Sequence, residues 1–373
     1  MSDSALYIMV AGFLGAGKTT SVIALADYLQ QKSKTIGVIT NDQAEDLVDT
    51  QLVKRSGFNV REIAGGCFCC RFSSLKEAAD HLTQASRPDV FIAEPVGSCT
   101  DLIATVSYPL RRLYGEDFTI APLSVLLDPI RAMRVHGIGV GNRFSEKIEY
   151  IYKKQIEESQ FIVINKCDRL SDEDRHALAV ELDKQYPDKQ QFWVSAKTGE
   201  GLEPWFEALI SQLGHTLPNN TLEIDYQEYA LGEAMLGWLN ATLDLKAIDD
   251  IDGNAFLEAF TKCLCENIAI SGGQIAHLKT TLKPSDDDYE MASVQVVDND
   301  QVPELGLSLS EEINAAELIV NARAEIEPKK LMAALDQTLI AMDDCRVELK
   351  LSHSDHFAPA EPVPEHRMEA KLG

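Results

Sequence analysis

The stretch Gly12-Phe13-Leu14-Gly15-Ala16-Gly17-Lys18-Thr19 decides the fold of this chain. It matches the phosphate-binding pattern G-x-x-x-x-G-K-[ST] at every fixed position. The glycines let the backbone wrap closely, so that successive N–H groups point at phosphate oxygens. Lys18 would place its ammonium at the β- and γ-phosphates, and Thr19 would offer its hydroxyl to Mg²⁺. The residues that we expect to bind a nucleotide here are Gly12, Gly15, Ala16, Gly17, Lys18, Thr19 and Thr20.

The sequence on both sides of this loop supports the same prediction. The apolar run at residues 5–11 is suited to a buried strand. After the loop, Val22, Leu25 and Leu29 recur at helical spacing, so the N-terminus of a helix would face the phosphates. The alternative is a chance glycine-rich turn, which the flanking strand and helix disfavour.

Two further motifs point to guanine as the base. Asn165-Lys166-Cys167-Asp168 follows an apolar run and has the N-K-x-D arrangement of GTP-binding proteins. An aspartate there accepts hydrogen bonds from N1–H and the exocyclic amine of guanine, an amine that adenine lacks. Asn165 and Lys166 would brace the loop. Ser195-Ala196-Lys197 matches the second guanine-binding loop, in which backbone N–H groups meet the base oxygen.

Several carboxylates follow predicted strands. Glu94-Pro95-Val96-Gly97 comes after the apolar run 89–93, so Glu94 could hold Mg²⁺ or orient the attacking water, and Gly97 permits close approach to the γ-phosphate. We expect Lys18, Glu94 and Asp49 to act in catalysis. The oxygen ligands expected for Mg²⁺ are Thr19, Glu94 and Asp42. As single residues, however, the aspartates Asp42, Asp49 and Asp128 are more typical of exposed loops.

Three thiols lie within four residues in Gly65-Gly66-Cys67-Phe68-Cys69-Cys70. The glycines allow a tight bend that could bring the sulfurs together. Thiolates are soft ligands that select Zn²⁺, Cu⁺ or another thiophilic metal, including Co²⁺ and Ni²⁺. We therefore expect Cys67, Cys69 and Cys70 to bind a transition metal. The other cysteines, Cys99, Cys167, Cys263, Cys265 and Cys345, are scattered and are interpreted as core residues.

Three histidines stand near the end of the sequence. His353 and His356 are three residues apart and could add a second metal contact, and His366 lies further along. Such pairs are more often surface residues than ligands.

Composition limits the class of protein. The 373 residues suit two domains, and the net charge of −25 argues against nucleic acid or an anionic membrane as partner. No basic and apolar leader is evident, and no run reaches the roughly 18 apolar residues of a membrane span. We therefore expect a cytoplasmic protein whose cysteines are reduced, which favours metal binding over disulfides.

Apolar runs alternate with helical patterns in the first part of the chain. This alternation predicts an α/β fold with a mostly parallel, doubly wound sheet, whose ligands bind at the carboxyl ends of the strands. The predicted strands cover residues 5–11, 35–40, 58–64, 89–93, 122–127, 160–164 and 190–194. The predicted helices include residues 72–86, 145–158, 171–185 and 202–213.

The pattern changes after Pro218-Asn219-Asn220 to the order β-α-β-β-α-β, which predicts a ferredoxin-like α+β domain. Its predicted strands are Trp238–Leu245, Ala276–Leu282, Glu317–Ile326 and Arg346–Leu351, with a further strand at Met291–Val297. Its predicted helices are Asn254–Ile270 and Pro328–Met342. We thus expect a P-loop GTPase domain at 1–217, an α+β domain at 222–356 and an extended proline-rich tail at 357–373.

Together these motifs resemble one family, the CobW-like metallochaperone GTPases, which are relatives of the nickel-insertion GTPases HypB and UreG among the SIMIBI-class P-loop proteins. Their C-x-C-C motif maps onto Cys67, Cys69 and Cys70, and their E-x-x-G motif maps onto Glu94 and Gly97. The chain departs from many relatives in lacking a histidine-rich stretch. It also has Asn41-Asp42-Gln43-Ala44 where Asn-Glu-Phe-Gly is usual.

Family members bind a transition metal at C-x-C-C, couple it to the GTP state and deliver it to a client. The resemblance therefore implies a Mg²⁺-dependent GTPase that converts GTP to GDP and carries Zn²⁺ or Co²⁺. Its partner would be a client metalloenzyme or a corrinoid-pathway protein, and a homodimer is allowed because relatives often dimerise around the nucleotide. Two alternatives stay open. One is a GTP-dependent activase that carries no metal, and the other is a nucleotide-dependent metal sensor or binding module.

Overall fold

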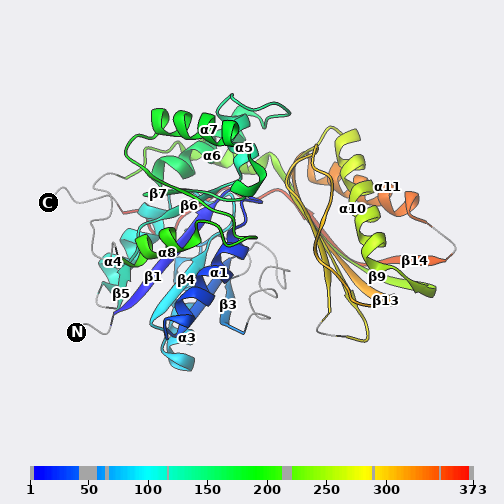
Figure 1. The fold of residues 1–373 in the computed structure, drawn as a ribbon, viewed down its shortest axis with the longest axis horizontal. Coiled ribbons are helices and arrows are strands. Elements are labelled where there is room, and N and C mark those ends of the chain that lie inside the picture. Colours follow the sequence, from blue (N-terminus) through cyan, green and yellow to red (C-terminus); the bar gives the residue numbers. More distant parts are fainter. Residues whose placement is uncertain are drawn as a thin grey trace. The chain divides into compact units, whose positions relative to one another are not determined.

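The computed structural model describes residues 4–41, 57–63, 67–115, 117–211, 221–287, 290–343 and 346–368 (Figure 1). The chain forms two compact units. Unit 1 comprises residues 1–140, 149–229 and 362–373, and unit 2 comprises residues 141–148 and 230–361. The proline-rich tail expected at 357–373 is therefore divided between the two units.

Unit 1 contains a parallel sheet in the order β3-β2-β4-β1-β6-β7-β8, with β5 also paired to β1. All of its strand pairs are parallel. Its strands are β1 (Ala5–Gly12), β2 (Ile36–Asn41), β3 (Asn59–Ile63), β4 (Val90–Glu94), β5 (Phe118–Ile120), β6 (Ser124–Leu127), β7 (Phe161–Ile164) and β8 (Gln190–Trp193). The prediction of a doubly wound α/β fold is confirmed, and β5 is the strand that the sequence patterns missed.

Helices surround this sheet (Figure 1). The predicted helices at 72–86, 145–158 and 171–185 are each present to within one residue, and the short helices between residues 103 and 135 were not predicted. The α-helices are α1 (Lys18–Gln31), α3 (Phe72–Ser86), α4 (Tyr108–Tyr114), α5 (Pro129–Val135), α6 (Glu146–Glu158), α7 (Asp172–Gln185), α8 (Leu202–Ser211) and α9 (Tyr226–Ala234). A π-helix, η1 (Ile103–Ser107), leads into α4, and a 3₁₀ turn, η2 (Cys167–Arg169), follows β7.

The core of unit 1 follows the alternation of side chains along its strands. In β1, Leu6, Ile8 and Val10 share one buried cluster with residues of α1 and α8, including Leu25 and Trp205. The helices and the sheet therefore share one apolar core. Packing of β1 in this core fixes the position of the phosphate loop that follows it.

Unit 2 is an antiparallel sheet in the order β12-β11-β10-β13-β9-β14. Helices α10 and α11 lie on one face of it (Figure 1). The elements are β9 (Leu236–Ile251), α10 (Gly253–Ile270), β10 (Gln274–Pro284), β11 (Ala292–Val296), β12 (Leu305–Leu307), β13 (Ile313–Glu325), α11 (Pro328–Ala341) and β14 (Val347–Phe357). The predicted β-α-β-β-α-β order is confirmed, with β11 and β12 inserted between its second and third strands.

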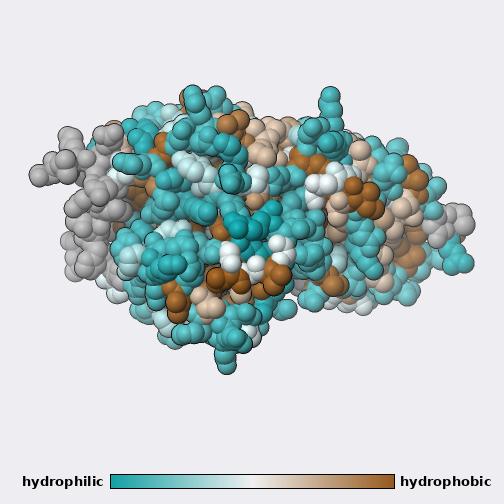
Figure 2. All heavy atoms as spheres, turned by 90° about the horizontal axis from the view of Figure 1, so that it is seen from above, coloured by the Kyte–Doolittle hydropathy of each residue, from teal (hydrophilic) through white to brown (hydrophobic). Residues whose placement is uncertain are grey.

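The surface agrees with an acidic, highly charged sequence. Figure 2 shows a face on which hydrophilic residues prevail and apolar residues form small, separate spots. Among the residues that the structure describes, every helix is too short or too polar to cross a lipid bilayer.

Candidate nucleotide and metal site

Parallel strands place the predicted site residues along one edge of the sheet. Because all strands of unit 1 run in the same direction, their carboxyl ends meet there, which is where ligands bind in folds of this type. In the order of the sheet from β3 to β8, the residues at or just after these ends are Cys67, Asn41, Glu94, Gly12, Asp128, Asn165 and Ser195. The cysteines therefore follow the strand at one side of the sheet, the phosphate loop lies centrally, and the base motifs lie at the other side.

The phosphate loop has the backbone conformation that its glycines predict. Gly12, Gly15 and Gly17 have φ values of 137°, 76° and 87°, which disfavour other residues. A Cβ atom at Gly17 would also collide with the side-chain amide of Asn165. The loop thus depends on glycine for both its curvature and its close packing against the N-K-x-D motif.

Side chains from α5 and from the segment after β7 bind the carbonyl groups of this loop. Asn165 Nδ2 donates to Ala16 O at 2.9 Å, and Lys166 Nζ donates to Gly15 O at 2.7 Å. The guanidinium of Arg131 donates to Leu14 O. Because these hydrogen bonds hold the carbonyl groups in place, the loop is preorganised to present its N–H groups to an anion.

Lys18 lies over its own loop. Its side chain is buried, and Nζ donates to Phe13 O across 3.4 Å, which is a long hydrogen bond. Such a bond is easily exchanged for a stronger one, so the ammonium is suited to contact phosphate oxygens.

Thr19 and Glu94 meet directly. Thr19 Oγ1 donates to Glu94 Oε1 at 2.9 Å, since β4 lies beside β1 in the sheet. The two residues offer a hydroxyl and a carboxylate oxygen at one point, which is the hard ligand chemistry that Mg²⁺ prefers. They fit the role predicted for them. The other two predicted carboxylates, Asp42 and Asp49, lie outside the described residues.

The interpretation of Asp128 as an exposed loop carboxylate is wrong. It is buried at the end of β6, accepts a hydrogen bond from Arg131 N at 3.1 Å as the N-cap of α5, and pairs with Lys166 Nζ at 2.9 Å. Burial alone would raise the pKa of Asp128, but the cations Lys166 and Arg131 lower it to about 2. The sequence signal was present: an aspartate directly before Pro129 is typical of a helix start.

The N-K-x-D motif and the Ser195–Lys197 loop are hydrogen-bonded to each other at the ends of β7 and β8. Asn165 Oδ1 accepts from Ala196 N at 3.0 Å, and Cys167 N donates to Val194 O at 3.0 Å. Asp168 and Lys197 are exposed, so both can reach a ligand in solvent. The structure therefore brings the N-K-x-D motif and the Ser195–Lys197 loop together, as their predicted shared role requires.

The three thiols converge on a turn before α3. Cys70 N and Arg71 N both donate to Cys67 O, at 3.0 and 2.9 Å. Phe68 is fully buried and anchors the turn in the core. The sulfurs of Cys67 and Cys69 are 2.7 Å apart, those of Cys69 and Cys70 are 3.6 Å apart, and all three lie within 4.8 Å of one another. Zn–S bonds of about 2.3 Å in tetrahedral geometry place sulfurs about 3.8 Å apart, so one ion could contact all three once the sulfurs of Cys67 and Cys69 move apart.

Hydrogen bonds between the thiols distribute their protons unequally. The hydrogen bond that Cys67 and Cys69 share lowers the pKa of Cys67 well below its usual range and raises the pKa of Cys69. A hydrogen bond with Cys67 raises the pKa of Cys70 to about 11. The cluster thus offers one thiolate readily, and metal binding must displace protons from the other thiols.

Residues 362–368, here called the C-terminal segment, run beside the cysteines. Glu365 N donates to Cys69 O at 3.0 Å. The Glu365 carboxylate also accepts from Ser73 N and Oγ, at 2.9 and 2.7 Å, and so caps the N-terminus of α3. Arg367 Nε donates to the buried Asp101 at 2.7 Å. Sequence reasoning missed these contacts, because nothing in a proline-rich tail indicates which surface it covers.

The histidines divide between the two units. His353 and His356 are exposed on β14 in unit 2. They are an odd number of residues apart, so their side chains point to opposite faces of the strand. His366 belongs to the C-terminal segment, and its ring packs edge-on against Phe72 with centroids 5.2 Å apart.

The last turn of α6 supports the segment that follows β4. Gln155 Nε2 donates to Gly97 O at 3.0 Å and to Cys99 O at 2.8 Å. The carboxylate of Glu158 accepts from Thr100 Oγ1 and Ile103 N, both at 3.3 Å. Burial raises the pKa of Glu158 to about 8, and the negative charge of Asp101 adds to this shift.

We expect this carboxyl group to make stability depend on pH. The pKa of Glu158 is about 8 in the folded chain and 4.5 ordinarily, so folding takes up a proton between these values. The contribution of Glu158 to the free energy of unfolding is then fully present below pH 4.5. It is lost as the pH rises towards 8, at about 1.4 kcal/mol per pH unit at most. Glu158→Gln cannot ionise and should gain stability relative to wild type from pH 5 to pH 8. Urea unfolding at several pH values measures the difference.

The exposed neighbour Glu157 supplies a matched control. Glu157→Gln makes the same substitution at the adjacent position, where the side chain is 40% exposed. It should follow the wild-type pH dependence. Parallel curves for wild type and Glu158→Gln would contradict a buried, protonated carboxyl at this position.

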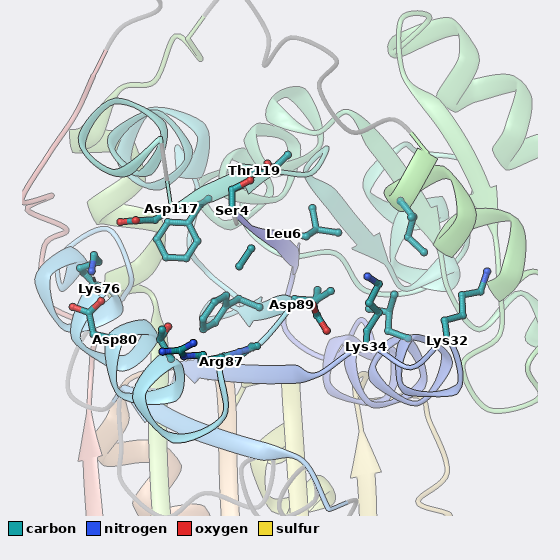
Figure 3. A pocket seen from close by; sticks show the side chains of 18 residues that line it. Ser4, Leu6, Lys32, Lys34, Lys76, Asp80, Arg87, Asp89, Asp117 and Thr119 are labelled. Carbon is teal, nitrogen blue, oxygen red and sulfur yellow. Dashed lines mark hydrogen bonds and ion pairs between the residues drawn. The ribbon is translucent and has the colours of Figure 1, made fainter. Parts of the chain in front are cut away.

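A separate cavity of about 940 Å³ lies at the opposite edge of the sheet. Figure 3 shows Ser4, Asp89 and Thr119 around it, at the starts of β1 and β4 and on β5. Four cationic side chains, Lys32, Lys34, Lys76 and Arg87, also line it, together with acidic residues. The phosphate loop follows the other end of β1, so this cavity is distinct from the candidate nucleotide site.

The chain is similar to several known proteins. Residues 6–193 match the model of the CobW/HypB/UreG nucleotide-binding domain. The chain is 27% identical over 173 residues to the zinc chaperone YeiR of Escherichia coli, an alignment that covers 46% of this chain and 49% of YeiR. It is 26% identical over 213 residues to the zinc chaperone CobW of a Sinorhizobium species, covering 52% and 59% of the two chains.

These alignments span about half the length of the curated relatives. Among solved structures, the chain is similar to HypB from Helicobacter pylori in complex with nickel, with a TM-score of 0.40 and 18% identity. That similarity covers 56% of this chain and 87% of the HypB chain.

Proposed function

The chain belongs to the CobW/HypB/UreG nucleotide-binding family, and on this premise we propose that it is a GTP-hydrolysing metallochaperone. It binds a transition metal at Cys67, Cys69 and Cys70 and couples delivery of that metal to the conversion of GTP to GDP. The observation that carries the proposal is the convergence of three sulfurs beside the same sheet edge that bears the phosphate loop.

The proposed GTP hydrolysis relies on residues of the phosphate loop, β4 and the N-K-x-D motif. Lys18 and the N–H groups of the phosphate loop hold the γ-phosphate and stabilise the charge that develops during hydrolysis. Thr19 and Glu94 would hold Mg²⁺, which would neutralise charge at the β- and γ-phosphates. Asp168 accepts hydrogen bonds from guanine, while the Lys166 stem covers the base. Asp49 is the further candidate for orienting water.

The metal is cargo in this proposal. Three thiolates bind a soft ion, Zn²⁺ or Co²⁺, and leave a coordination position through which a client metalloenzyme can receive it. A reducing compartment such as the cytoplasm keeps these thiols available. The chain between Asn41 and Cys70 joins the nucleotide site to the thiols. Contact of this segment with the γ-phosphate would order it in the GTP-bound state, and hydrolysis would release it. The metal affinity of the thiols would therefore differ between the GTP-bound and GDP-bound states.

We expect the metal content to follow both the thiols and the nucleotide. Purified protein should hold about one equivalent of Zn²⁺ or Co²⁺, and its metal affinity should differ between a GTP analogue and GDP. Replacing Cys67, Cys69 and Cys70 together with serine should remove the bound metal. Elemental analysis and competition with a chromophoric chelator measure these quantities.

A cysteine from unit 2 provides the control. Cys263 lies on α10, so Cys263→Ser should leave metal content unchanged. Retention of tight metal binding by the triple variant would contradict the assigned metal site. Equal affinity in both nucleotide states would contradict the coupling.

A further inference from the structure

The C-terminal segment, residues 362–368, binds two parts of unit 1 that are far apart in the sequence. At the turn that carries the thiols, Glu365 N donates to Cys69 O at 3.0 Å. In the stretch that follows β4, Arg367 Nε donates to Asp101 Oδ2 at 2.7 Å. We propose that this segment is a latch on the thiol turn, and that it opens to let the metal leave. This inference rests on the proposed metal site.

Glu365 holds the thiol turn at two adjacent points. Its backbone N–H binds Cys69 O, and its carboxylate accepts from Ser73 N and Oγ, at 2.9 and 2.7 Å. The next residue, His366, packs edge-on against Phe72 with ring centroids 5.2 Å apart. One short peptide therefore restrains the backbone from the second cysteine of the motif to the first turn of α3.

The thiol turn has to change shape when a metal is exchanged. The sulfurs of Cys67 and Cys69 are 2.7 Å apart. Two sulfurs bound to one Zn²⁺ in tetrahedral geometry are about 3.8 Å apart, so loading and release change this separation by about 1 Å. The backbone that carries these sulfurs is the one that Glu365 binds. The closed segment therefore opposes the movement that metal exchange requires.

The other end of the segment is anchored on a buried carboxylate. Asp101 is 1% exposed, and its Oδ2 accepts from Arg367 Nε and from the hydroxyl of Tyr226, both at 2.7 Å. Its φ of 63° is uncommon for a residue other than glycine. Within the part of the chain that the structure describes, Asp101 Oδ1 has no hydrogen-bond partner. The ion pair with Arg367 therefore compensates a buried charge, which makes it a specific contact.

The segment can open while the rest of unit 1 stays folded. Val363 is 71% exposed and Glu365 is also exposed, so the attachment depends largely on the polar contacts described above. Regions with few buried apolar contacts open at a free energy well below that of global unfolding. We expect the closed form to retain the metal and the open form to release it.

The rate of metal release tests this proposal. The full chain is loaded with one equivalent of Zn²⁺ and mixed with an excess of a chromophoric chelator. Arg367→Gln should still hold one equivalent, but release it at least about 10-fold faster, because a hydrogen bond to a charged group contributes about that factor or more to the opening equilibrium. Glu365→Gln should act in the same direction. Arg367→Lys keeps the positive charge and should release Zn²⁺ at a rate between those of wild type and Arg367→Gln.

A matched control and two contrary outcomes make the test decisive. Glu361 is exposed and immediately precedes the segment, so Glu361→Gln should release Zn²⁺ at the wild-type rate. An unchanged rate in Arg367→Gln would overturn the latch while the metal site stood. Loss of Zn²⁺ from this variant before the chelator is added, with a lowered thermal unfolding midpoint, would indicate a structural contact and would overturn it too. No Zn²⁺ binding by wild type would overturn both the latch and the proposed function.

Hydrogen exchange of the wild type supplies a test without any variant. The amides of Glu365 and Met368 donate to Cys69 O and Ala104 O, at 3.0 and 2.9 Å. If the segment opens by itself, both amides should exchange faster than those of the central strand β1. Exchange as slow as that of β1 would mean that the segment opens only when unit 1 unfolds, and this result would overturn the latch.

Discussion

Lys18→Ala is expected to reduce GTP turnover by about 10²- to 10³-fold or more, the usual effect of removing one group that stabilises transition-state charge. The Lys18 ammonium lies over the phosphate loop and donates to Phe13 O across 3.4 Å. Alanine leaves the helical start of α1 intact, because it is a strong helix former. The loss should therefore arise in catalysis and phosphate binding. Phosphate release under saturating GTP measures it, together with thermal unfolding to check the fold.

Lys32 at the other end of the same helix supplies the control. Its side chain is 45% exposed and pairs with Glu207. Lys32→Ala removes an equal charge far along α1 and should retain nearly full turnover. Turnover by Lys18→Ala above a tenth of wild type would contradict the assignment of the phosphate site.

Asp168→Asn is expected to exchange the base preference from guanine to xanthine. The carboxylate accepts two hydrogen bonds from guanine, and bonds to a charged group contribute about 1.5–3 kcal/mol each. An amide in its place can accept from N1–H and donate to the 2-oxo group of xanthine. Affinity for GTP should fall by about 10²-fold or more, while affinity for xanthosine triphosphate should rise. Competition between the two nucleotides for a fluorescent analogue measures the exchange.

Asp172 is the matched residue for this experiment. It is exposed at the start of α7, four positions further along the chain. Asp172→Asn should keep the preference for GTP. An unchanged preference in Asp168→Asn would show that N-K-x-D does not bind the base in this protein.

The sequence allowed most of the fold to be predicted, because its information is local. The phosphate loop has a fixed pattern, and the strands of unit 1 are short apolar runs whose ends appear within one or two residues of their predicted positions. Thr19 and Glu94, 75 residues apart, could be expected to lie close together because they stand at the carboxyl ends of strands in one parallel sheet. Motif spacing and strand order were sufficient to predict this contact.

Features that depend on packing between distant segments could not be predicted in this way. Asp128 was interpreted as an exposed loop carboxylate. In the folded chain it is buried, and the nearby cations Lys166 and Arg131 stabilise its negative charge. Side-chain partners of this kind are set by tertiary structure, where neither hydrophobic period nor motif spacing applies.

The contacts of Glu365 and Arg367 have a practical consequence for dissecting the molecule. A recombinant fragment that stops at residue 217 or 229 would keep the phosphate loop, both base motifs and every thiol of the cluster. It would lack the peptide that binds Cys69 O, caps α3 and occupies Asp101. In such a fragment the turn that carries the three thiols would lose these hydrogen bonds, so metal affinities measured on it would describe an altered turn.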